Sequence, residues 1–255
     1  MATTTPIQTQ VKLGKLPVRS DVRTLRLPRY VDRAKLPPPP RALDLAAPVP
    51  EWPMYANDRI GDCTTAAAAH MIEAWTAPVR GEPVEVSERA VLAAFDRVKQ
   101  VDPATGEEGA VELDVLKDWR KTGIARHKIG AFVRVPVSDH RLVRVAAFLF
   151  GGVYIGIELP LSAQQQETWD WTHRLDGPAR PGSWGGHAVD VVGFDRAALT
   201  VVTWGSLKEL TWAFWDRYVD EAYAILSVDF LDEAGEAPNG FDLSALKTDL
   251  ALVTS

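Results

Sequence analysis

Cysteine is almost absent from this chain. Its 255 residues contain one cysteine, Cys63, together with three methionines and five histidines. A single thiol cannot form an internal disulfide, and disulfides are typical of secreted proteins, so the sequence predicts a cytoplasmic protein. The sequence also lacks a cysteine cluster, a His-Glu-x-x-His pair and a glycine-rich phosphate-binding loop. We therefore expect no metal ion and no bound cofactor.

Long hydrophobic runs are missing as well. The apolar stretch 143–161 is interrupted by Arg144 and by Gly151-Gly152, whereas a membrane-spanning helix needs roughly 20 apolar residues in succession. The first residues, 1–6, lack the basic and apolar regions of a secretory signal. Positive charge is not in excess, because the formal net charge is −6. We therefore expect neither a membrane nor a nucleic acid as the main partner.

The chain divides into three stretches of different composition. Residues 1–41 are basic and proline-rich, and we expect them to form an extended arm. We expect residues 42–231 to form the folded domain and residues 232–255 to form a tail with a short helix. With 46% hydrophobic residues, the middle stretch can bury a full core.

The arm has two alternative interpretations. It is either a short pro-segment that crosses the active-site groove or a structural arm that wraps the body. We expect the structural arm, packed along the back of the lobes, because it has an aliphatic series with little helical period. That series comprises Leu13, Leu16, Leu25 and Leu27.

Helices precede strands along the folded domain. Apolar spacing predicts helices over 63–76, 87–100, 113–121 and 139–150, and strands over 133–136, 153–159, 199–205, 222–227 and from 187 onward. This order predicts an α+β protein in two lobes, one helical and one an antiparallel sheet or barrel, with the active site between them.

Cys63 lies at the N-terminus of the first predicted helix, directly after the turn 57–62. Free backbone N–H groups and the helix dipole stabilise a thiolate at such a position, so we expect the thiol pKa to be lowered. The same N–H groups can hold a developing oxyanion. Asp62 is the expected helix cap. The alternative for a lone cysteine is a buried structural residue.

A histidine follows about 120 residues later in a second motif. Gly185 and Gly186 lead to His187, which begins an apolar strand, and a hairpin returns toward Thr203. The two glycines let another backbone come close, so we expect them to bind substrate. A cysteine on a helix, a histidine on a strand and a polar residue on the next strand form an arrangement of nucleophile, base and orienting group. Trp169 and Trp184 precede the histidine in a long loop, where aromatic side chains can line a substrate cleft.

These residues resemble the papain-like cysteine peptidases, and a bacterial branch of that family in particular. The family has an amide side chain six residues before its cysteine and a glycine two before it, matched by Asn57 and Gly61. The family's histidine opens a strand of the form His-Ala-Val followed by Val-Gly-aromatic, matched by 187–189 and 192–194. The resemblance covers roughly residues 40–230 in the same order. It implies the papain-like bilobed fold.

The resemblance also implies a reaction on a peptide or protein substrate. Cys63 attacks an amide carbonyl to form a thioester, His187 is the base, and Asn57 with the Cys63 N–H holds the oxyanion. Asn57 is shorter than the family's glutamine. The family's orienting asparagine is replaced by Thr203, counted from the histidine, or by Val202, counted from the tryptophan that follows. We expect Thr203 to face His187, because only its hydroxyl can accept a hydrogen bond.

Two alternative functions use the same architecture. A transpeptidase-like or transglutaminase-like acyl transferase forms the same thioester and resolves it with an amine. A non-catalytic binding module keeps the papain-like fold without the reaction. For a peptidase, we expect the Cys63 sulfur and a ring nitrogen of His187 within about 4 Å of each other.

Overall fold

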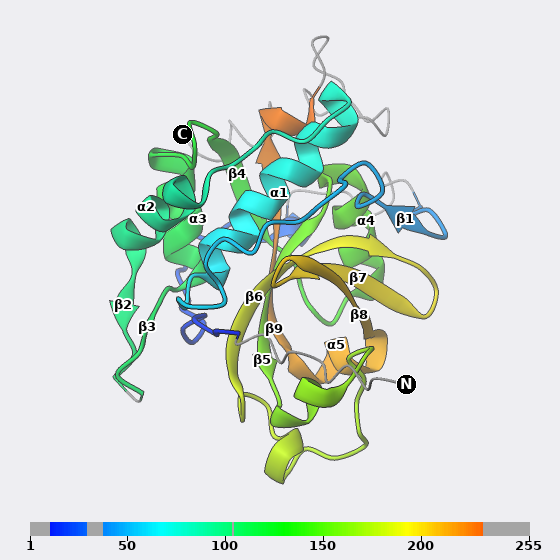
Figure 1. Ribbon diagram of the computed structural model, residues 1–255. Helices are drawn as coiled ribbons and strands as arrows, with labels where there is room; N and C mark the ends of the chain where they lie inside the picture. The colour runs from blue at the N-terminus through cyan, green and yellow to red at the C-terminus, as the bar shows by residue number, and fades with distance from the viewer. Residues whose placement is uncertain (1–10, 30–37, 104, 232–255) are drawn as a thin grey trace, which may run out of the picture.

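The computed structural model describes residues 11–29, 38–103 and 105–231 (Figure 1). The predicted C-terminal tail, residues 232–255, lies outside the described residues, as do residues 1–10 and 30–37 of the arm. No helix within the described part of the chain is long and apolar enough to cross a membrane.

Three helices form one lobe. They are α1 (Cys63–Arg80), α2 (Glu88–Val98) and α3 (Glu112–Lys121). The first fifteen residues of α1 are all buried, and its many alanines allow other elements to approach closely. The ring of Trp75 on α1 stacks on Trp119 of α3 with centroids 5.6 Å apart. A short hairpin, β2 (Gln100–Val101) with β3 (Glu108–Gly109), connects α2 to α3.

An antiparallel sheet forms the other lobe. Its strand order is β4-β9-β5-β6-β7-β8, and the short β1 (Leu43–Asp44) also pairs with β6. These strands are β4 (Ile129–Arg134), β5 (Val153–Leu159), β6 (Gly185–Phe194), β7 (Ala198–Thr203), β8 (Ser206–Thr211) and β9 (Val219–Ser227). Two helices belong to this part of the chain, α4 (His140–Phe150) and α5 (Trp212–Tyr218). Four short 3-10 helices complete the described elements, at Leu27–Arg29, Leu161–Gln165, Gly177–Ala179 and Val228–Phe230.

The two lobes meet where α1 packs against β6, and this contact positions the site (Figure 1). The helix begins at Cys63, and β6 carries His187 near its own start. The hydroxyl of Tyr154 on β5 donates a hydrogen bond to the Thr64 carbonyl at 2.9 Å, which fixes the beginning of the helix to the sheet. The predicted order of helices and strands is confirmed, as is the division into a helical and a sheet lobe.

Residues 12–16 of the arm lie between the lobes, beside β3 and β6, where Figure 1 draws them in deep blue. The Lys15 N–H donates to the Gly186 carbonyl at 3.1 Å, while on the other side the Leu16 N–H donates to the Ala110 carbonyl at 2.9 Å. The Ala110 N–H in turn donates to the Gly14 carbonyl at 2.8 Å. The expectation that this stretch packs along the back of the lobes is therefore wrong. Backbone pairing with both lobes decides its path, and that pairing leaves no signature in the aliphatic pattern.

Residues 25–27 of the arm lie on the sheet lobe. The Arg134 N–H at the end of β4 donates to the Leu25 carbonyl at 2.8 Å, and Leu27 is buried in the main core. Earlier in the arm, Leu16 joins a small apolar cluster with Val111 and Leu113 at the start of α3.

Candidate active site

Cys63 is the first residue of α1, and its side chain is 1% exposed. Burial raises the pKa of the thiol to about 12, although backbone hydrogen bonds from Ala188 and Gly14 act in the opposite direction. The expected lowering of this pKa is therefore wrong for the protein with its arm in place. The arm removes water from the sulfur, and this loss of solvation outweighs the favourable helix terminus.

His187 lies on β6, directly before the residue whose N–H bonds to the Cys63 sulfur. Its Nε2 is 2.8 Å from Oγ1 of Thr203 on β7. Its Nδ1 has no hydrogen-bond partner among the described residues, the Cys63 sulfur included, so the expected contact between sulfur and imidazole stays a prediction. Burial lowers the pKa of the imidazole to about 3, so the ring is neutral while the arm is docked. The structure thus places Thr203 against the histidine, whereas Val202 packs in a separate apolar cluster.

Trp204 covers the histidine. The two rings stack with centroids 4.3 Å apart and an interplanar angle of 17°. The Trp204 indole N–H also donates to the Lys12 carbonyl of the arm at 3.1 Å, and its ring contacts Trp184 at 5.5 Å. The residue has a φ of 45°, in the left-handed region that a tryptophan rarely adopts. The surrounding contacts hold this conformation, which places the indole over the imidazole.

Asn57 is buried in the turn before α1. Its side-chain amide donates to the Ile60 carbonyl at 3.1 Å, and the backbone carbonyl of Asn57 accepts from the Lys12 N–H at 2.8 Å. Its place in the oxyanion site stays a prediction. Asp62, at the start of α1, makes no capping hydrogen bond through its side chain, so the expected cap is wrong. Burial instead raises the pKa of Asp62 to about 8.

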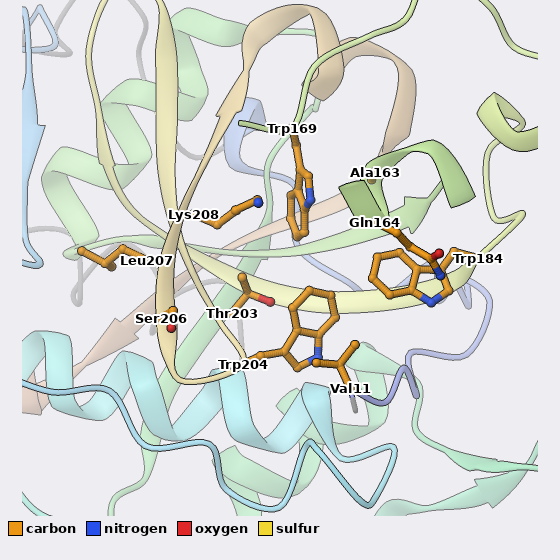
Figure 2. Close-up of a pocket in the computed structure, with 10 residues that line it drawn as sticks. All are labelled: Val11, Ala163, Gln164, Trp169, Trp184, Thr203, Trp204, Ser206, Leu207 and Lys208. Carbon is orange, nitrogen blue, oxygen red and sulfur yellow. The ribbon is translucent and has the colours of Figure 1, made fainter. Parts of the chain in front are cut away.

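A pocket of about 770 Å³ opens beside Thr203 and Trp204 (Figure 2). Trp169 and Trp184, which the sequence placed at a substrate cleft, both line it. The full lining consists of Val11, Ala163, Gln164, Trp169, Trp184, Thr203, Trp204, Ser206, Leu207 and Lys208. The Lys208 ammonium lies 5.8 Å from the Trp169 ring centroid, within reach of a cation–π contact.

Gly185 and Gly186 lie on the strand edge that contacts the arm. A side-chain carbon at Gly186 would lie 2.2 Å from the Lys15 carbonyl oxygen, and one at Gly185 would lie 2.8 Å from the Leu13 side chain. These glycines therefore let another backbone segment, here the arm, approach the strand just before His187, which is the role that their sequence position suggested.

Sequence reasoning missed a group of buried carboxylates on the other side of the groove. Glu112 of α3 and Asp220 and Glu221 of β9 surround the Lys15 ammonium. The sequence signal that could have indicated this group is the charged pair Asp220-Glu221 at the start of an otherwise apolar strand. Within the described ranges, no group of three or more His, Cys, Asp or Glu side chains is arranged to hold a metal ion.

Comparison with protein-family models gives no match, and comparison with curated proteins gives none at a significant level. Several solved structures are similar to this one. Xylellain, a cysteine protease from Xylella fastidiosa, has a TM-score of 0.63 and 17% identity, covering 89% of this chain and 100% of that chain. ProCathepsin B S9 from Trypanosoma congolense has a TM-score of 0.60 and 13% identity, covering 88% and 89%. A Carica candamarcensis cysteine protease in complex with E-64 has a TM-score of 0.52 and 16% identity, covering 74% and 99%.

These similarities extend over most of the chain. The protein has the papain-like fold that the sequence resemblance implied, with its mixture of helices and an antiparallel sheet.

Proposed function

We propose that this chain is a papain-like cysteine peptidase or related amidase, in which Cys63 attacks an amide carbonyl and forms a thioester. One observation carries the proposal: the helix terminus with Cys63 lies against the strand with His187, and that histidine lies 2.8 Å from Thr203. This is the arrangement of nucleophile, base and orienting group that thiol acyl transfer requires.

The reaction follows from these three residues. When Nε2–H of His187 donates to Thr203, the imidazole keeps Nδ1 free to accept the proton of the Cys63 thiol. The thiolate then bonds to the substrate carbonyl carbon, and the backbone N–H of Cys63 and the amide of Asn57 hold the oxyanion. The imidazolium gives its proton to the leaving amine as the carbon–nitrogen bond breaks. Water then gives a proton to His187 and adds to the thioester carbonyl carbon. As the carbon–sulfur bond breaks, the acid is released and the imidazolium gives this proton to the sulfur.

We further propose that the arm is a short pro-segment that holds the site inactive. While it is docked, burial raises the pKa of the thiol and lowers that of the imidazole, so both groups are neutral. The arm turns the N–H of Gly14 toward the sulfur, and the Gly14 carbonyl is bonded to the Ala110 N–H instead. The arm therefore blocks the nucleophile without offering it a carbonyl to attack.

Labelling with an epoxide-type thiol inhibitor tests this function. Mass spectrometry should show one adduct at Cys63 in a full-length variant whose arm is displaced, and no adduct in Cys63→Ala. His187→Ala in the same background should slow the labelling strongly at pH 6, because the thiolate loses its base. Equal labelling rates with and without His187 would exclude the catalytic pair. Addition of an amine acceptor during peptide turnover, with mass analysis of the products, separates hydrolysis from acyl transfer.

A further inference from the structure

The Lys15 side chain of the arm is buried inside the protein. Its ammonium group lies 2.7 Å from Oδ2 of Asp220 and 3.6 Å from Oε1 of Glu221, and the side chain is 2% exposed. Burial by itself lowers the pKa of a lysine, but Glu112, Asp220 and Glu221 outweigh it and raise the pKa above the ordinary value. A buried lysine in this state is charged, so the surroundings form a site for a cation.

The site is a pocket made by the absence of a side chain at Gly156. A carbon atom added there would lie 2.1 Å from Cε of Lys15, 2.8 Å from Oδ1 of Asp220 and 2.9 Å from Oε1 of Glu112. In the sheet, Gly156 pairs with Ala188 on one side and with Glu221 on the other. The strand that supplies His187 therefore borders the pocket, and an alanine at position 156 would fill it.

The pocket holds more hydrogen-bond acceptors than Lys15 uses. Both carboxylate oxygens of Glu112, Oδ1 of Asp220 and Oε1 of Glu221 have no hydrogen-bond partner among the described residues. Glu112 and Glu221 are each 0% exposed. A lysine offers three donors and an arginine five in a planar fork, so the spare oxygens suit a guanidinium group as well as an ammonium group.

The pocket is next to the reacting sulfur. Gly14, the neighbour of Lys15, bonds through its N–H to Cys63, and the Lys15 N–H bonds to the carbonyl directly before His187. A peptide whose side chain enters this pocket therefore has its backbone at the nucleophile, within about two residues of the bond under attack.

We propose that this pocket selects a lysine or arginine side chain of the peptide substrate, with Glu112, Asp220 and Glu221 as the residues that determine specificity. The arm docks by placing its own lysine where the substrate's basic residue binds. The inference rests on the proposed peptidase function for its substrate, but the binding preference of the pocket can be measured without catalysis.

The binding test uses the full chain with Gly14→Ala and Cys63→Ala. The probe is a synthetic peptide that copies residues 11–19, compared with the same peptide carrying norleucine in place of Lys15, and tryptophan fluorescence reports binding. We expect the lysine peptide to bind at least about tenfold more tightly, the scale of one hydrogen bond to a charged group. Glu112→Gln should reduce this ratio, and so should Asp220→Asn at a partly exposed position where folding is less at risk. Asp176→Asn, an exposed carboxylate outside the pocket, should not. Equal affinities for the two peptides would overturn the proposal.

The turnover test uses the full chain with Gly14→Ala and fluorogenic peptides that vary in the two residues before the cleaved bond. At one of these positions, kcat/KM for lysine and arginine should exceed that for norleucine by about tenfold, and kcat/KM for glutamate should be the lowest. Glu112→Gln should reduce the differences in kcat/KM between these peptides. Cleavage without a preference for basic residues would overturn the proposed specificity of the pocket, while the proposed peptidase function would stand. If binding keeps its lysine preference while no peptide is cleaved, the pocket stands and the peptidase function fails.

Discussion

Gly14 of the arm and Gly61 of the turn before α1 are packed backbone to backbone. A side-chain carbon added to Gly14 would lie 1.7 Å from the Gly61 carbonyl oxygen, far inside any allowed contact. The arm can therefore reach the Cys63 sulfur only because residue 14 has no side chain.

Gly14→Ala should release the arm and activate the protein. The added methyl group cannot be accommodated between Gly61 and the sulfur, so the docked state loses its closest contact. We expect peptide turnover by the full-length variant to rise at least about tenfold over the unmodified chain, since a clash of this kind costs more than 1.4 kcal/mol. A change in tryptophan fluorescence should accompany it, because Trp204 loses its hydrogen bond to Lys12.

The control for this prediction is Val22→Ala, a fully exposed position further along the arm. It should change neither turnover nor fluorescence. If Gly14→Ala is as inactive as the unmodified chain while Cys63 becomes accessible to inhibitor, the arm is not what holds the site inactive.

Thr203→Val should lower the turnover of the Gly14→Ala protein by about tenfold, the scale of one ordinary hydrogen bond. The substitution keeps the shape of the side chain but removes the Oγ1 that lies 2.8 Å from Nε2 of His187. Thr203→Asn should preserve or raise the rate, because an amide oxygen also accepts the imidazole N–H. Thr200→Val, on the same strand, serves as the matched control. An undiminished rate in Thr203→Val would assign the orienting role to another group.

Acid should loosen the docked arm. Burial depresses the pKa of His187 to about 3 while the arm is docked, and exposure returns it toward its ordinary value of about 6.5. A depressed pKa stabilises the docked state above about pH 6.5, and that contribution is lost as the pH falls from 6.5 toward 3. Tryptophan fluorescence and limited proteolysis of the arm should therefore report more of the open state at pH 4.5 than at pH 7.5.

His187→Gln tests the origin of this acid response. The variant should release its arm at a lower pH than the parent protein, because the depressed pKa of His187 no longer contributes. The groups near Cys63, Asp62 and Glu112, are unchanged in this variant. Identical release curves for the two proteins would remove His187 from the explanation.

Glu73 should make the folded protein less stable at high pH. It is buried on α1 and accepts a hydrogen bond from the Tyr55 hydroxyl, and burial raises its pKa to about 7. A raised pKa contributes stability that is complete below about pH 4.5 and is lost as the pH rises through 7. Glu73→Gln should reduce the loss of unfolding free energy between pH 5 and pH 8 by up to about 3 kcal/mol. Denaturant unfolding at both pH values measures this, with the exposed Glu82→Gln as the control.

The sequence predicted those parts of the structure that depend on local period and on motif spacing. The α1 helix at Cys63 and the strand at His187 were predicted from side-chain patterns along single elements. The contact with Thr203 was predicted from its interval after the histidine and from its hydroxyl group. The order of the elements predicted a helical and a sheet lobe, and the motif resemblance implied their papain-like arrangement.

The features that could not be predicted depend on contacts between segments that are far apart in the sequence. The arm binds both lobes through backbone groups, which every residue carries, so its leucines gave no guide to its path. The thiol pKa followed the burial imposed by the arm and not the local helix terminus. The carboxylates around Lys15 come from α3 and β9, and only the folded structure brings them together.

The docked arm also determines the chemical lifetime of the sulfur. Peroxide oxidises a cysteine in its exposed thiolate form, through sulfenic to irreversible sulfinic and sulfonic acids. Cys63 is protonated and enclosed while Gly14 lies against it, so it meets neither condition. Oxidative damage should accumulate with the time the arm spends open and not with the age of the preparation, so the latent protein is a reservoir of reduced thiol in aerobic solution.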